Sequence, residues 1–314
     1  MLSQRSIPTS RWNLNNYIIM NKKIITIIIA LATVCGGASA QQKQGHARIP
    51  ISRDTGKGTV VDHTKVRVWY ALNADKTDDM NTYIDCQRLD IGDSITKCYS
   101  WFVFNSDSLR ADWSKKHRGA KSAPMWLGPG GKKQNNWCQY EWSDFYIKKG
   151  QLTEYACMPS RLGQYNSYYT EPHPQMTWTL GAERQTIIGY DCQKAMCHWR
   201  GRDYVAWFTA AIPVKAGPWK FGGLPGLILK VYDTNRLYTF EAVGIERGKH
   251  PIQQYEYKGY KKRTRAEVQK YQRTFAENWP KAVGWRRGTV DAGGHVVLGE
   301  AVSKFTPYNP LELE

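Results

Sequence analysis

Residues 184–209 read RQTIIGYDCQKAMCHWRGRDYVAWFT, and this stretch predicts the fold most directly. It divides into three short segments, residues 184–188, 191–199 and 203–209, separated by Gly189 and Gly201. Glycine supplies the backbone angles that tight turns need. Short segments at this spacing predict consecutive strands of an antiparallel meander.

The same organisation continues toward the N-terminus. In residues 65–72, apolar side chains alternate with others at a period of two, which is typical of a half-buried strand. Further strands are predicted at residues 83–90, 95–104, 137–147 and 151–158. We therefore expect a mostly β, α+β fold, with a single curved, largely antiparallel sheet or half-barrel and one or two helices.

Two segments predict helices, and one predicts a long loop. Residues 106–116 place apolar side chains four apart on one helical face. Thr264 and Glu267 have the spacing of a capping box, which predicts a helix over residues 265–278. Residues 118–136 are rich in glycine, proline and lysine and predict a loop or insertion.

Residues 20–40 have the order of a signal peptide. Lys22 and Lys23 precede an apolar run of about eleven residues, 24–34, and Ala38-Ser39-Ala40 follows it. The run is shorter than the roughly twenty residues that span a bilayer, and small residues suit signal peptidase. We therefore predict export, with cleavage after the last of these alanines.

Several questions about the N-terminal region stay open. The apolar run could persist as a membrane anchor, or Cys35 could be lipidated, although a valine directly before it is unfavourable. Residues 1–17 show no pattern of their own, so the true start could be Met20 rather than Met1. The expected organisation is an extension and cleaved signal peptide, a mobile leader and a single domain, at residues 1–40, 41–64 and 65–314.

The exported chain is basic and carries an even number of cysteines. Its net charge falls from +17 to +13 when residues 1–40, which hold four basic residues and no acid, are removed. No nucleic-acid motif accompanies this charge. In an exported chain the charge either serves solubility alone or meets an anionic lipid surface, an acidic glycan or an acidic protein face. In an oxidising compartment the cysteines predict disulfides, and proximity along the chain suggests the pairs Cys86–Cys98, Cys138–Cys157 and Cys192–Cys197.

The most specific motif is a turn of six residues: Gly223, Leu224, Pro225, Gly226, Leu227 and Ile228. Proline followed by glycine predicts a type II turn, in which the glycine takes a positive φ. Two interpretations of the leucines remain open. Leu224 and Leu227 either belong to the core or form an exposed apolar lip that binds a lipid, a peptide or a partner protein.

This motif and its surroundings resemble the GLPGLI family, which is named after it. The resemblance runs over residues 187–233 and includes the approach at 188–195 and the segment 206–209. It implies an exported envelope protein of Bacteroidota-type bacteria, often encoded beside outer-membrane transport proteins, and no established activity. The loop at 118–136 and the extra cysteines depart from the family pattern.

The sequence contains few of the motifs that mark catalytic sites. No nucleophile elbow, H-E-x-x-H motif, P-loop or dinucleotide fingerprint occurs. Cys192, Cys197 and His198 could bind zinc or copper, or act in nucleophilic chemistry, if no disulfide forms. Three acids could form a carboxylate pair for glycoside chemistry: Glu141, Asp144 and Glu154. Two tryptophans lie beside cations and could form a ligand surface: Trp199 and Trp219.

We therefore expect no catalytic residue, no metal and no cofactor. The predicted protein is a non-enzymatic binding or assembly accessory to an outer-membrane transport system. It is expected in the periplasm or at the outer-membrane periphery of a Gram-negative cell, without a transmembrane helix in the mature chain. The alternative is a periplasmic carrier of a small apolar ligand or a metal ion.

Overall fold

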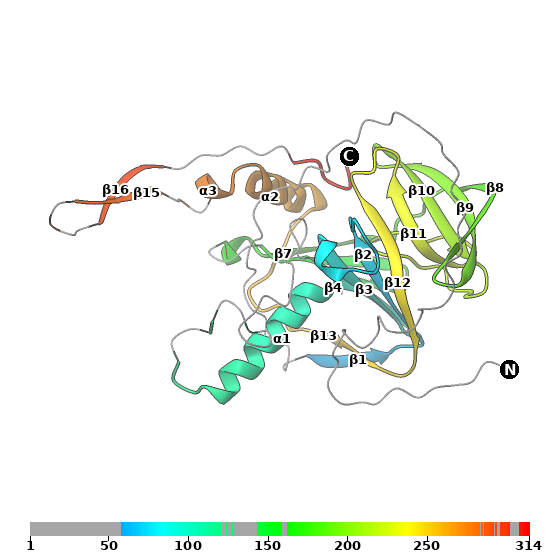
Figure 1. Cartoon of the computed structure of the whole chain (residues 1–314), viewed down its shortest axis with the longest axis horizontal. Helices are drawn as coiled ribbons and strands as arrows, with labels where there is room; N and C mark the ends of the chain where they lie inside the picture. The colour runs from blue at the N-terminus through cyan, green and yellow to red at the C-terminus, as the bar shows by residue number, and fades with distance from the viewer. Residues whose placement is uncertain are drawn as a thin grey trace, which may run out of the picture. The chain divides into compact units, whose positions relative to one another are not determined.

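Two antiparallel meanders, joined side by side, build the fold (Figure 1). The computed structural model describes residues 58–120, 123–124, 127, 143–158, 162–282, 284, 286–291, 293, 296–301 and 308–314. All of them belong to one compact unit, Lys43–Glu314.

Twelve strands form the main sheet. In spatial order they are β14 (Lys261–Lys262), β7 (Ser167–Pro172), β6 (Gln151–Ala156), β5 (Ser143–Lys148), β4 (Ile95–Ser100), β3 (Asp85–Ile91), β2 (Val66–Leu72), β12 (Thr239–Arg247), β11 (Leu227–Asp233), β10 (Arg202–Thr209), β9 (Tyr190–Trp199) and β8 (Thr179–Ile187). Strands β2 to β7 and β8 to β12 are each consecutive, and β2 pairs with β12. Every pair is antiparallel except β14 with β7. The predicted mostly β, largely antiparallel fold is confirmed.

The sheet curves so that strands from distant parts of its order approach one another. Arg200, in the turn between β9 and β10, lies 2.9 Å from Glu171 in β7, although seven strands lie between β7 and β10 in the order of the sheet. One buried cluster contains side chains of both meanders, among them Leu152 of β6 and Leu229 of β11. The inner face of the curved sheet therefore encloses the main core.

The first helix, α1 (Trp101–Lys116), begins directly where β4 ends. The expected strand at 95–104 and helix at 106–116 were therefore wrong at their shared boundary. Ser100 is the N-cap: its Oγ accepts a hydrogen bond from Val103 N at 3.1 Å and donates to Asp85 Oδ1 at 2.8 Å. The apolar residues after it suit a strand locally, but this cap starts a helix that buries Phe102.

The second predicted helix is confirmed as α2 (Arg265–Glu277), with the complete capping box of Thr264 and Glu267. A short helix, α3 (Trp279–Ala282), follows it. Two 3₁₀ turns lie at Met80–Thr82 and Gly163–Tyr165. No helix in the described part of the chain is both long and apolar enough to cross a membrane.

Two smaller sheets lie outside the main one. β1 (Thr59–His63) pairs with β13 (Pro251–Gln254), so regular structure begins before the expected residue 65. β15 (Arg286–Val290) pairs with β16 (Val296–Ala301). Most of the loop predicted at 118–136 lies outside the described residues.

Candidate functional site

The last residues of the chain, 308–314, lie against the main sheet although they belong to no strand. Framework side chains bind the main-chain carbonyls of this tail. Arg202 Nε donates to Pro310 O at 2.9 Å, and Tyr204 OH donates to Leu311 O. Tyr238 OH likewise donates to the carbonyl of Asn309. Three consecutive carbonyls of the tail are thus recognised by donors from β10 and the loop before β12.

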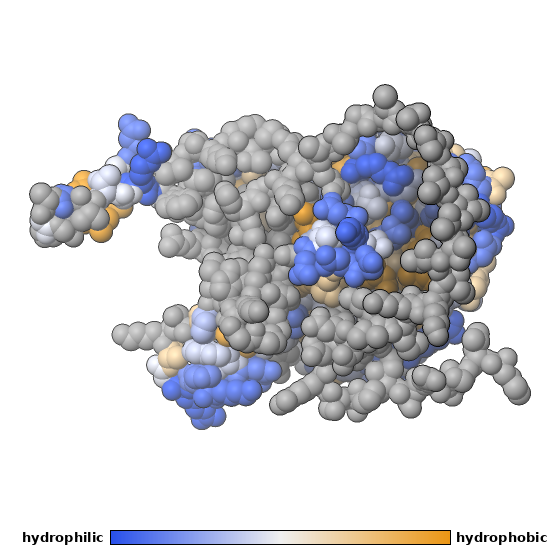
Figure 2. Space-filling view, viewed as in Figure 1, coloured by the Kyte–Doolittle hydropathy of each residue, from blue (hydrophilic) through white to orange (hydrophobic). Residues whose placement is uncertain are grey.

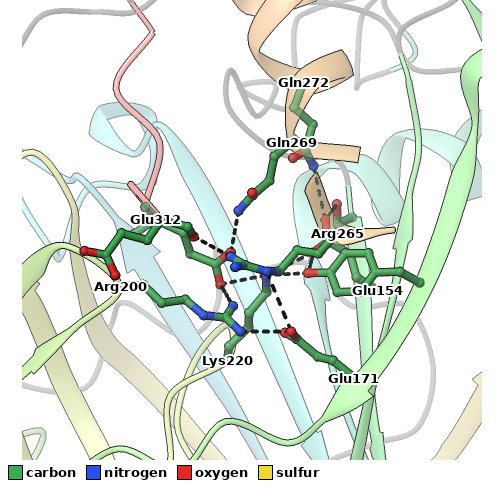
Figure 3. A network of polar contacts seen from close by, with 12 residues as sticks. Glu154, Glu171, Arg200, Lys220, Arg265, Gln269, Gln272 and Glu312 are labelled. Atoms are coloured by element: carbon green, nitrogen blue, oxygen red, sulfur yellow. Dashed lines mark hydrogen bonds and ion pairs between the residues drawn. The ribbon is translucent and has the colours of Figure 1, made fainter. Parts of the chain in front are cut away.

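The carboxylate of Glu312 is the polar centre of this site (Figure 3). It accepts hydrogen bonds from Gln269 Nε2 at 2.7 Å and Lys220 Nζ at 3.0 Å. Arg265 binds its second oxygen at 3.1 Å, and Arg200 binds the first. Four donors from the β9–β10 turn, the loop before β11 and α2 therefore converge on one buried carboxylate.

Lys220 connects this carboxylate to a second one in β6. Its Nζ lies 3.1 Å from Glu154 Oε2 and donates to Tyr169 OH at 2.8 Å. Tyr169 OH in turn donates to Glu154 at 2.7 Å, and Ser143 Oγ and Gln272 Nε2 donate to the other Glu154 oxygen at 2.7 and 3.1 Å. The buried ammonium and both carboxylates thus have several partners, as buried charges require.

A third carboxylate, Glu171, lies at the edge of the cluster. Its Oε2 is 2.9 Å from Arg200 and 3.8 Å from Arg265. Its Oε1 is buried and has no hydrogen-bond partner among the described residues. Burial raises the pKa of Glu312, but Lys220 and Arg200 outweigh that effect and hold the pKa of this carboxyl below its usual value.

A tight turn positions Arg200, and a neighbouring indole ring contacts Lys220. Arg200 and Gly201 both have positive φ, at 46° and 77°, as a two-residue hairpin turn with type I′ geometry requires. A Cβ atom at Gly201 would lie 2.9 Å from Leu313 Cβ, so glycine also lets the turn approach the tail. Lys220 follows Trp219, and its Nζ lies 4.9 Å from that indole ring.

A cavity of about 300 Å³ lies between α2 and the tail. Besides members of the cluster, its lining includes Lys270 and Arg273 of α2 and Tyr308, Pro310 and Leu313 of the tail. The arrangement binds the carboxylates of Glu154, Glu171 and Glu312 through fixed cations, and the cavity beside them has both polar and apolar lining.

The leucines of the six-residue motif are buried, with Leu224 1% and Leu227 0% exposed. The expected exposed apolar lip is therefore absent from this structure, because both side chains belong to the main core. Gly223 and Pro225 are the exposed members of the motif. Of the two interpretations, the structure favours the core role.

The predicted type II turn was also wrong. The positive φ belongs to Gly223, at 89°, and Gly226 N donates to Leu224 O at 2.8 Å, which closes a three-residue turn centred on Pro225. Gly226 is needed for a different reason. A Cβ atom there would lie 2.2 Å from Thr209 O, so only glycine allows this approach to β10.

The predicted pair Cys86–Cys98 is contradicted by the strand register. Cys98 lies opposite Leu89, and Cys86 is an odd number of residues from Leu89, so the two thiols lie on opposite faces of the sheet. Cys192 and Cys197 lie on one strand, β9, at a separation of roughly 16 Å, far beyond the reach of a disulfide. Their predicted pairing was therefore wrong as well.

Cys138 lies outside the described residues, so its predicted pairing with Cys157 stays a prediction. The metal site expected as an alternative at Cys192, Cys197 and His198 is not assembled. Cys197 is buried, whereas the neighbouring His198 is exposed, with its Nδ1 2.7 Å from Asp203 Oδ1. No cluster of three His, Cys, Asp or Glu side chains in the described residues could hold a metal ion.

The acids considered for a carboxylate pair are also not brought together. Glu154 faces the cluster described above, whereas Asp144 lies on the other face of β5 and accepts a hydrogen bond from Tyr257 OH at 2.6 Å. Glu141 lies outside the described residues. Trp219 is buried in the core and packs against Trp199 at a ring-centroid distance of 5.5 Å, so it does not form an open ligand surface.

Exposed apolar side chains also lie on two hairpins, which belong to different sheets. Leu180, Ile188 and Met196 lie on the β8–β9 hairpin, where β8 is the edge of the main sheet. Val296, Val297 and Leu298 lie on β16, and hydrophobic residues are visible on this hairpin as orange surface in Figure 2. These six are most of the large apolar side chains that are exposed in the described part of the chain.

One segment of the chain matches a known protein family. Residues 200–230 match a family described as "Protein of unknown function (Porph_ging)", and this segment contains Arg200, Lys220 and the six-residue motif. No curated protein matches the chain.

Two solved structures are similar in part, titled "Structure of PNGF-II in P21 space group" and "Structure of PNGF-II in C2 space group". They are 13% and 14% identical, with a TM-score of 0.45 each, over 69% and 68% of this chain and 34% and 33% of theirs. The chain thus spans about a third of the length of those proteins.

Proposed function

We propose that the chain is an exported, non-enzymatic envelope protein of the GLPGLI type, which binds a partner as an accessory to an outer-membrane transport system. Export rests on the signal-peptide pattern of residues 20–40. The partial family match at residues 200–230 supports the assignment to a family without a known activity.

The observation that carries partner binding is the exposed apolar side of β16. Val296 is 69% exposed and Leu298 is 64% exposed, and as alternate residues of one strand they share a face. The hairpin of β15 and β16 has no third strand among the described residues. A two-stranded hairpin is marginal alone in water, and neighbouring exposed apolar residues mark an interaction surface. A protein partner that covers this face would stabilise it.

The test is co-purification of the protein from the envelope of its own cells, after mild crosslinking. Leu298→Asp, alone and with Val296→Asp, should abolish recovery of the partner while the protein stays folded and exported. Val60→Asp is the matched control, because Val60 is an exposed strand valine, 47% exposed, outside this surface. Recovery of the same partner with all three variants would contradict the proposal. Leu224 does not suit this test, because its burial couples it to folding.

The second candidate is a periplasmic carrier, which the cavity of about 300 Å³ beside α2 favours. Its charged and amide lining favours a polar ligand over the expected apolar one. Native mass spectrometry of protein taken from its own periplasm should then show a retained small molecule. A mass equal to that of the mature chain in repeated preparations would remove this candidate.

A further inference from the structure

The tail at 308–314 is held in the way that a receptor holds a peptide. The framework binds it chiefly through groups that every peptide has, because the carbonyls of Asn309, Pro310 and Leu311 each accept from a framework side chain. The tail belongs to no strand, so its departure would break no sheet ladder.

Two side chains of the tail add selectivity to this main-chain recognition. Leu311 is 5% exposed and belongs to the main core cluster, so it fills an apolar pocket. Glu312 follows it and takes four donors from three elements. The groove therefore selects an apolar residue followed by a carboxylate, which is a short and specific pattern.

The charges of the groove require an occupant. Without Glu312, three cations, Arg200, Lys220 and Arg265, face two carboxylates, Glu154 and Glu171. An excess positive charge in a largely buried site attracts an anion, and a third carboxylate would restore the balance.

The tail does not use the whole site. The cavity of about 300 Å³ continues the groove along α2, where Lys270 and Arg273 offer cations to a larger acidic ligand. This difference matters because a tail attached to the same chain has a high effective concentration in its own groove. A competing peptide must make more contacts than the tail makes, and the cavity provides the room.

We propose that this groove is a receptor for an acidic peptide segment of a partner protein, with an apolar residue followed by glutamate, and that the chain's own tail occupies it in cis. The partner segment displaces the tail and extends into the cavity along α2. This site is separate from the apolar face of β16, so either proposal can fail without the other.

The experiment uses the full chain with a protease site inserted between residues 302 and 307, so that cleavage leaves the tail in place but no longer tethered. The probe is a fluorescein-labelled peptide of the tail sequence YNPLELE, followed by fluorescence anisotropy. The nicked protein should bind the probe saturably, and the uncut protein should bind it at least about tenfold more weakly. The peptide YNPLQLE should bind the nicked protein at least about tenfold more weakly than YNPLELE.

Variants of the groove keep the result specific. Arg265→Gln, on the surface of α2, should weaken binding of the probe by about tenfold. Lys262→Gln removes an exposed cation nearby and should leave binding unchanged. Retention of the original tail after prolonged incubation with excess probe would overturn the proposal, because the tail would then be a permanent part of the fold. Dimers formed by exchange of tails between two copies would overturn the assignment to a partner protein.

Discussion

Lys220 Nζ lies 3.0 Å from Glu312 Oε1, across 92 residues of sequence, and 3.1 Å from Glu154 Oε2 on its other side. All three side chains are 3% exposed. One ammonium thus balances two buried carboxylates and holds the end of the chain against β6. Since an unpaired buried charge is strongly destabilising, the stability of the fold depends on this contact.

Replacing Lys220 with methionine should lower the free energy of unfolding by about 3–5 kcal/mol, because two carboxylates lose their shared cation inside the protein. Urea unfolding followed by tryptophan fluorescence measures the change. The control is Lys230→Met, which breaks a more exposed pair with Glu241 and should cost less than about 1 kcal/mol.

A double variant separates the contribution of the ion pair between Lys220 and Glu312 from the packing of the two side chains. Lys220→Met combined with Glu312→Gln should lose at least about 1 kcal/mol less than the sum of the two single changes, because the second change removes one of the charges that the first leaves unpaired. Strictly additive losses would show that the ion pair contributes nothing beyond the volume of its side chains.

The acid limb of the stability curve should depend on Glu312. Its pKa in the folded protein lies below the ordinary value of 4.5, so the folded state favours the ionised form. That stability is present above the unfolded pKa and is lost as the pH falls through the folded pKa. Glu312→Gln should therefore lower the urea midpoint at about pH 7 and flatten its further decrease toward about pH 3. Parallel curves for the two proteins would contradict this assignment.

The two glycines of the motif should respond differently to alanine. Gly226→Ala places a Cβ atom 2.2 Å from Thr209 O and should cost at least about 3 kcal/mol, because a backbone atom must move. Gly223→Ala meets no atom closer than 3.8 Å, but it must adopt a φ of 89° and should cost about 1–2 kcal/mol. Thermal unfolding of both variants gives the order, and a larger loss at Gly223 would show that turn conformation matters more than close packing.

Much of the sheet could be predicted because its signal is local. The alternation in residues 65–72 and the turn glycines between β8, β9 and β10 are properties of a few consecutive residues. The predicted half-burial of that strand was wrong, because β2 lies in the middle of the sheet and is buried on both faces. The start of α1 could not be predicted in this way, because the apolar residues after Ser100 suit either structure. The choice depends on the contact of Ser100 with Asp85, which comes from another strand.

The candidate site could hardly be predicted from the sequence either, because it too depends on contacts between distant segments. Glu312, Lys220 and Arg265 lie in separate segments of the sequence, and only the curvature of the sheet brings them together. The run Leu311-Glu312-Leu313-Glu314 is the one local signal, since alternating apolar and acidic residues suggest a docking segment. The six-residue motif, by contrast, was easy to find, and its apolar side chains, Leu224, Leu227 and Ile228, belong to the core.

The cysteines provide the last test, because register rather than proximity decides their pairing. We expect Cys86, Cys98, Cys192 and Cys197 to be thiols in the mature protein. Burial raises the pKa of the Cys98 thiol to about 12 and that of Cys192 to about 11, so alkylation of the native protein near neutral pH should be slow. Denaturation without a reductant should then expose all four to iodoacetamide, and peptide mass spectrometry would locate each label. An unlabelled Cys86 or Cys98 that reacts only after reduction would show that the two strands pair in a different register.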